Sequence, residues 1–140
     1  MGIIYLSIIM ADKSTVMRAF NTHLFEFLDD IITILPGNVE IQTAKNAFQT
    51  IKKANPTAII KVWYSHLYSP YRTVIDRGEI DFFFEKDYSS DLADLRNAGE
   101  VMKIIDTLRE PVRNMSEQQK GFTMKYLQNL SKISLIYSGL

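Results

Sequence analysis

The densest acidic group of the 140-residue sequence consists of Asp81, Glu85, Asp87 and Asp91. Carboxylate oxygens are the ligands that Mg²⁺ and Ca²⁺ prefer, so such a group could bind a divalent cation. The spacing does not match the calcium-loop pattern, however, in which the acidic ligands are arranged around a glycine. Helix capping, ion pairing and solvated charge are the favoured interpretation, and no metal site is predicted.

The other residue types that support catalysis are absent or scattered. The two histidines, His23 and His66, lie far apart and match no metal-ligand or triad spacing. A hydrogen-bonded structural role is expected for His23, which lies beside an apolar helical stripe. The sequence has no cysteine, and its six glycines form no phosphate-binding loop or dinucleotide fingerprint. We therefore predict a protein that is not an enzyme and binds no cofactor.

Basic and acidic residues balance overall but are segregated along the chain. Sixteen of each give a formal net charge of zero, which argues against a dedicated nucleic-acid-binding protein. Residues 1–40, 41–75, 76–100 and 101–140 carry net charges of −3, +5, −5 and +3. These blocks either neutralise one another within the fold or provide complementary charge for neighbours in an assembly.

Helical periodicity marks the elements at both ends of the sequence. An apolar stripe with spacings of three and four predicts a helix over residues 14–35, which Pro36 and Gly37 end. A second helix is predicted over residues 39–54, with Asn38 as its N-cap.

The last helix is marked by a capping box, in which Ser116 is followed three residues later by Gln119. Its predicted buried face consists of Phe122, Tyr126, Leu130, Ile133 and Tyr137. A kinked helix, or two helices, is predicted between Ser89 and Pro111, because Gly99 weakens the pattern there.

The aromatic segment of residues 54–88 is expected to organise the fold. Asn55 and Pro56 together resemble an N-cap and a first helical position, so a helix is predicted to begin there and run to about residue 68. Few of its residues are polar, which predicts burial on several sides around Trp63. Ser69 and Pro70 repeat the cap-and-proline signal, and Gly78 ends a short second helix at a corner.

Three consecutive phenylalanines, Phe82, Phe83 and Phe84, follow this corner, with Tyr88 close behind. Successive side chains point in different directions in a helix or a strand, so at least one of these rings must face away from any single core. The favoured interpretation is a short buried turn that packs against the ends of neighbouring helices. The alternative is a partner-binding cluster of Phe82, Phe83, Phe84 and Tyr88, since aromatic rings contribute strongly to interfaces.

The first ten residues are apolar except for Ser7. This run is well short of the roughly 20 residues that cross a bilayer, so no transmembrane segment is predicted. Four β-branched residues favour an extended arm that docks on the protein itself or on a partner: Ile3, Ile4, Ile8 and Ile9. The overall prediction is an all-α fold, with an N-terminal apolar arm (residues 1–12) and a single compact bundle of about six helices (residues 13–140).

Five stretches of this sequence resemble a family of small helical proteins from large icosahedral DNA viruses of algae and protists. They are KKANP, IIKVWY, YRTVIDRGEIDFFFEKDYSSDL, IDTLREPVRNMS and MKYLQNLSKIS. The resemblance spans about residues 18–138 and leaves the arm outside it. Some small helical proteins of such viruses are minor capsid components, which lie beneath the major capsid shell and bridge capsomers. The family supplies no catalytic residues that could be matched to this chain.

The resemblance implies a structural minor capsid or capsid-associated protein that resides in the virion and is made in the host cytoplasm. Its expected partners are the major capsid protein, other minor capsid proteins and its own copies. The alternative function is a viral regulatory or nucleic-acid-binding factor. That factor would contact phosphates through the basic side chains of Lys45, Lys52, Lys53 and Lys61.

Overall fold

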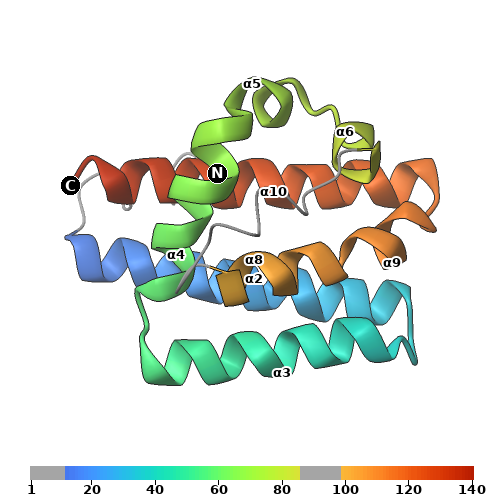
Figure 1. Ribbon diagram of the computed structural model, residues 1–140, viewed down its shortest axis with the longest axis horizontal. Coiled ribbons are helices and arrows are strands. Elements are labelled where there is room, and N and C mark those ends of the chain that lie inside the picture. The colour runs from blue at the N-terminus through green and yellow to red at the C-terminus, as the bar shows by residue number, and fades with distance from the viewer. Residues whose placement is uncertain (1–11, 86–98) are drawn as a thin grey trace.

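The computed structural model describes residues 12–85 and 99–140, and all the regular secondary structure within these ranges is helical (Figure 1). The predicted all-α fold is confirmed. The four isoleucines of the arm, Tyr88 and the side chain of Phe84 lie outside the described residues.

Three long helices, α2 (Lys13–Ile34), α3 (Val39–Ala54) and α10 (Glu117–Ser138), form the frame of the fold. Helix α2 packs against both of the others and runs antiparallel to each (Figure 1). The bounds of α3 match the prediction, and those of α2 differ by one residue at each end. These helices were predictable because their start and stop signals are local.

Side-chain caps explain where α2 and α3 begin. The carboxylate of Asp12 accepts a hydrogen bond of 2.8 Å from the backbone N–H of Thr15, and the side chain of Asn38 accepts one of 3.1 Å from Ile41. Each bond satisfies one of the N–H groups that a helix start leaves without a partner. The hydrogen bond from Thr15 also lowers the pKa of Asp12, since it favours the charged form.

The aromatic segment forms three helical elements without a break: α4 (Ala58–Val62), η1 (Trp63–Tyr68) and α5 (Ser69–Arg77). The predicted helix start at Asn55 was displaced, since α4 begins at Ala58, although the side chain of Asn55 accepts a 3.2 Å hydrogen bond from the backbone N–H of Thr57. Asn55 instead follows the end of α3, where its N–H bonds to the carbonyl of Ile51.

The predicted corner at Ser69 was also displaced. Ser69 has helical dihedrals, and the non-helical backbone lies at Tyr71, with φ −114° and ψ 24°. The glycine stop was correct: Gly78 adopts the left-handed conformation with φ 73°, which glycine reaches without steric cost.

Element η1 is a π-helical turn, with wider i to i+5 hydrogen bonding than an α-helix. Residues five apart therefore lie on one side, whereas in an α-helix they would be well separated around the axis. Trp63 and Tyr68 are five apart, and both are buried, at 2% and 3% exposure. The wider turn thus lets a single short element bury both rings.

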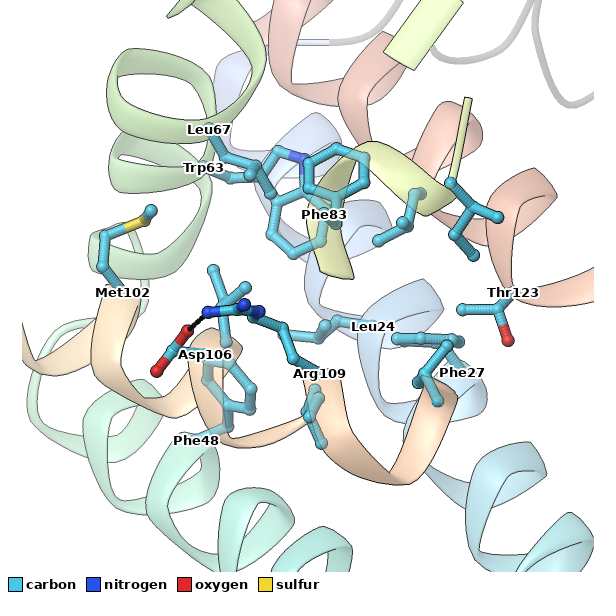
Figure 2. A pocket seen from close by; sticks show the side chains of 15 residues that line it. Leu24, Phe27, Phe48, Trp63, Leu67, Phe83, Met102, Asp106, Arg109 and Thr123 are labelled. Atoms are coloured by element: carbon cyan, nitrogen blue, oxygen red, sulfur yellow. Dashed lines mark hydrogen bonds and ion pairs between the residues drawn. The ribbon is translucent and has the colours of Figure 1, made fainter. Parts of the chain in front are cut away.

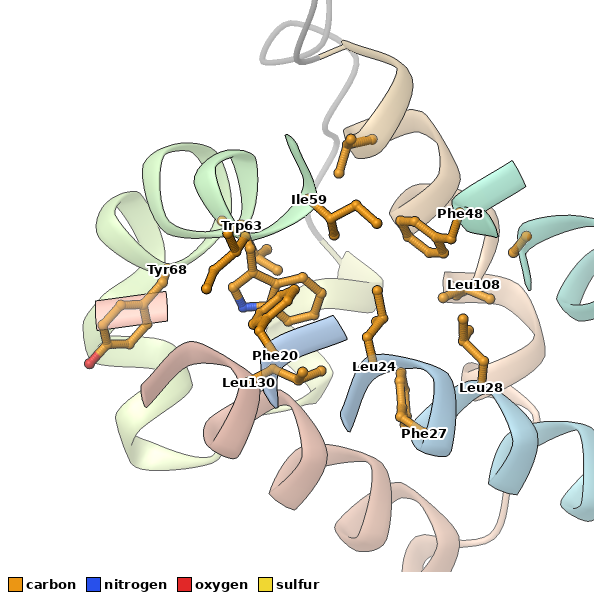
Figure 3. Close-up of a cluster of buried hydrophobic side chains, with 14 of the residues drawn as sticks. Phe20, Leu24, Phe27, Leu28, Phe48, Ile59, Trp63, Tyr68, Leu108 and Leu130 are labelled. Atoms are coloured by element: carbon orange, nitrogen blue, oxygen red, sulfur yellow. The ribbon is translucent and has the colours of Figure 1, made fainter. Parts of the chain in front are cut away.

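Trp63 lies at the centre of the core (Figure 3). Its ring meets that of Phe20 edge to face at 5.7 Å between centroids, and its indole Nε1–H donates a 3.0 Å hydrogen bond to the hydroxyl of Ser131. Helices α2, η1 and α10 therefore meet around this indole. The predicted burial of Trp63 by its neighbours is confirmed.

The predicted capping box of α10 is confirmed, with both of its hydrogen bonds between Ser116 and Gln119 in place. The predicted buried face was partly wrong, because Phe122 is 59% exposed. Small hydroxyl residues, among them Thr123, Ser131 and Ser134, are buried instead. Their small side chains allow close packing, and all three hydroxyls are hydrogen-bonded. Thr123 and Ser134 donate to backbone carbonyls of α10, and Ser131 accepts the indole N–H of Trp63.

Three shorter helices complete the described chain: α6 (Asp81–Glu85), α8 (Gly99–Thr107) and α9 (Arg109–Arg113). Helix α8 packs against α3, and α9 contacts α6 and α8. Helix α8 ends at Thr107, before Pro111, and this proline lies in the first turn of the separate helix α9. Proline is tolerated there because the N–H groups of a first turn have no acceptor in the helix.

Candidate interaction surface

The phenylalanines of α6 face the core to different degrees. Phe83 is only 8% exposed, whereas Phe82 is half-buried. The ring centroid of Phe82 lies 5.7 Å from that of Tyr71 and 5.8 Å from that of Phe83. In this conformation Phe83 serves as a core residue, which agrees with the favoured interpretation of a turn packed against neighbouring helices.

Phe83 also lines an apolar cavity of about 80 Å³ (Figure 2). The side chain of Trp63 forms another part of its lining, and the lining residues Arg109 and Asp106 form an ion pair of 2.8 Å. Most of the lining offers no hydrogen-bonding group, so water has little to bind there. The full lining consists of Leu24, Phe27, Phe48, Trp63, Leu67, Ile80, Phe83, Met102, Ile105, Asp106, Leu108, Arg109, Val112, Thr123 and Leu127.

The acidic group is only partly within the described chain, where Asp81 is exposed at the start of α6. Within residues 12–85 and 99–140, no three histidine or acidic side chains gather as metal ligands would. The same ranges contain no helix with the length and apolar character that crossing a bilayer requires.

The four lysines of the nucleic-acid alternative are divided between structural contacts and solvent. Lys45 forms a 2.6 Å ion pair with Asp29, and the ammonium of Lys52 lies 5.1 Å from the ring centroid of Phe25. Lys53 and Lys61 are exposed on α3 and α4. Two of the four lysines are thus already engaged in contacts with other side chains of the protein.

A second aromatic group lies where α2 and α10 pack together, and we call His23, Phe122 and Tyr126 the aromatic patch. The centroid of the Tyr126 ring lies 4.9 Å from that of His23 and 6.4 Å from that of Phe122. The buried ring of Phe27 supports Tyr126 from below, at 5.0 Å. The exposed ring of Phe122 therefore packs against Tyr126, whose ring in turn contacts His23 and Phe27.

Charged and polar groups surround the aromatic patch. Nδ1 of His23 lies 3.5 Å from a carboxylate oxygen of Glu26, on the α2 side. Lys125 and Asn129 lie on the α10 side and, together with the patch residues, line a shallow hollow of about 250 Å³. Exposed apolar groups with a polar rim are typical of interaction sites.

Tyr126 joins the two helices through its hydroxyl, which donates a hydrogen bond to the carboxylate of Asp30. Burial of the ring, followed by the hydrogen bond and negative charge of Asp30, raises the pKa of Tyr126 to about 12. The negative charge of Glu26 acts in the same direction. The neutral phenol is therefore the form that the folded protein favours.

This raised pKa predicts a loss of stability in alkali. Because the folded pKa of about 12 exceeds the ordinary value of 10.0, the stabilisation from Tyr126 is fully present below pH 10 and is lost as the pH rises toward 12. The free energy of unfolding should fall more steeply over that range in the natural protein than in Tyr126→Phe. Urea unfolding at a series of pH values measures both, and parallel curves would contradict the assignment. The difference in absorbance between the two proteins during alkaline titration should give the midpoint directly.

For Phe122, the structure differs from the sequence-based prediction. Tyr126 and Phe122 were expected on a buried face, and a hydrogen-bonded structural role was expected for His23. The available signal was the pair of aromatic residues four apart on one helix, which lie on the same side. Whether that side is covered depends on where α2 packs, which no local pattern indicates.

Comparison of the chain with protein-family models, curated proteins and solved structures gives no match.

Proposed function

We propose that this protein is a structural, capsid-associated component of a large icosahedral DNA virus, which acts by binding its own copies and the major capsid protein. In this role it lies beneath the capsid shell, bridges capsomers and resides in the virion. The proposal combines the sequence resemblance with the properties of the described surface. In this proposal the protein acts by binding partners through the shape and charge of its surface, and no reactive group takes part.

The observation that supports this proposal most directly is the exposed ring of Phe122 in the aromatic patch. Phe122 is 59% exposed although it belongs to a well-packed helix. Aromatic side chains contribute a large share of the binding energy in many protein interfaces. An exposed ring on a packed helix is therefore suited to contact with a protein partner.

Two measurements test the capsid role. Mass spectrometry of purified virus particles should detect the chain, and the purified protein should co-sediment with the major capsid protein at low salt. We expect this binding to weaken as salt rises, because the segregated charge blocks contribute to it. Removal of residues 1–9 should weaken binding further if the apolar arm is a capsid contact.

The control for this truncation is a measurement of its folding in the absence of capsid protein. Its helix content and melting temperature should equal those of the full chain, so that any lost binding reflects a lost contact. Absence of the chain from particles, together with no affinity for capsid protein, would exclude the proposal. Binding that instead follows added DNA or RNA and falls steeply with salt would favour the nucleic-acid alternative.

A further inference from the structure

The aromatic patch presents a protruding ring and a hollow on the same face. Phe122 supplies the protruding ring, at 59% exposure. The hollow of about 250 Å³ beside it is lined by the rings of His23 and Tyr126 and by Lys125 and Asn129. The face therefore combines one exposed apolar ring with neighbouring aromatic and polar side chains.

Opposite charges lie on the two sides of the patch. On the α2 side, the side chain of Glu26 is 60% exposed, and Asp30 is exposed one turn further along the helix. On the α10 side, Lys125 is exposed. Helices α2 and α10 run side by side and antiparallel (Figure 1). The acidic residues of α2 and the basic residue of α10 therefore lie on either side of the contact between the two helices.

We propose that this patch is the interface of a homodimer whose two-fold axis runs between α2 and α10, parallel to both. Rotation about that axis exchanges the two sides of the patch and keeps the position along the helices. Helix α10 of each protomer then lies over α2 of the other. Lys125 of one protomer faces Glu26 and Asp30 of the other, and each Phe122 packs against α2 of the other protomer.

Self-complementarity is the reason for assigning the patch to a second copy. An isologous interface uses one surface twice, so that surface must contain both halves of each contact. This patch contains the carboxylates of Glu26 and Asp30 on one side and the ammonium of Lys125 on the other, and the two-fold axis brings them opposite one another. A nucleic acid fits it less well, since the exposed carboxylates of Glu26 and Asp30 would repel phosphates.

Sedimentation velocity of the full chain tests the dimer without any other component. A reversible dimer is expected as the concentration rises from about 1 to about 100 μM, with weaker association at high salt. Phe122→Ala should raise the dissociation constant on the order of tenfold or more. Val39→Ala is the matched control, because Val39 is also an exposed apolar side chain, at 75%, but lies on α3 away from the patch.

A charge exchange tests the geometry of the axis. Glu26→Lys and Lys125→Glu should each weaken the homodimer, since each places like charges opposite one another. An equimolar mixture of the two variants should recover a heterodimer, because both of its cross-interface pairs are again of opposite charge. Circular dichroism and thermal melting of each variant exclude misfolding as the cause.

Two results would overturn this inference: a monomer at every concentration, or a dimer that Phe122→Ala leaves unchanged. Failure of the mixture to recover association would exclude the stated axis. The biological role of this dimer rests on the proposed function in capsid assembly, but the dimer itself is tested independently of that function. A chain that dimerises but is absent from particles would contradict the capsid role alone, and a monomer found in particles would contradict the dimer alone.

Discussion

Replacing Trp63 with alanine is expected to lower the free energy of unfolding by roughly 3–5 kcal/mol, the cost of truncating a large buried aromatic side chain. The indole is 2% exposed, packs edge to face against Phe20 and donates a hydrogen bond to Ser131. Its removal would leave a void where three helices meet. A domain of this size is stable by only about 5–15 kcal/mol, so the variant should be close to unfolding at physiological temperature.

Urea denaturation followed by circular dichroism measures this loss. Ser131→Ala separates the polar part of the effect, because it leaves the buried N–H of Trp63 without its acceptor, at a cost of about 1–3 kcal/mol. Val39→Ala is the control for an exposed apolar side chain outside the aromatic patch and should change stability by less than about 0.5 kcal/mol. A loss of less than about 1 kcal/mol for Trp63→Ala would contradict the central position of this ring.

Replacing Phe83 with alanine should also destabilise the protein, by roughly 3 kcal/mol, at the lower end of the range for buried phenylalanines. The side chain is 8% exposed and lines the apolar cavity, so its truncation would enlarge a void that already exists. The two interpretations of the phenylalanine cluster differ here. A core residue costs stability when truncated, whereas a side chain held ready for a partner costs binding and little stability.

Thermal and urea unfolding of Phe83→Ala should therefore be compared with Phe82→Ala. Phe82 is half-buried against Tyr71, so its truncation should cost less than that of Phe83. Equal and negligible losses for both variants would indicate that α6 contributes little to the core. In that case the partner-binding interpretation would be the better one.

The elements that were predictable from sequence are those with local signals. Asn38, the capping box of Ser116 and the left-handed Gly78 each determine a helix end through groups within a few residues. The aromatic segment was predicted less well. Its backbone depends on burying Trp63 and Tyr68 together, and this tertiary requirement favours a π-helical turn over the regular helix that its composition suggests.

The buried face of α10 shows a second limit. Hydroxyl residues such as Ser131 and Ser134 appear polar in sequence, yet they are buried because each hydroxyl is hydrogen-bonded. The true face is thus rotated from the predicted one, and Phe122 is left exposed. The candidate interaction surface follows from this rotation, which is why sequence periodicity alone did not indicate it.

The indole between α2, η1 and α10 is also a built-in optical probe. Trp63 is the only tryptophan of the sequence, so the intrinsic tryptophan emission originates at a single known point of the core. Shielded from water, it should emit at short wavelength and resist quenching by acrylamide, and unfolding should shift the emission to longer wavelength. Events confined to the protein exterior should leave this emission unchanged, so one spectrum can separate loss of the core from a change of partner.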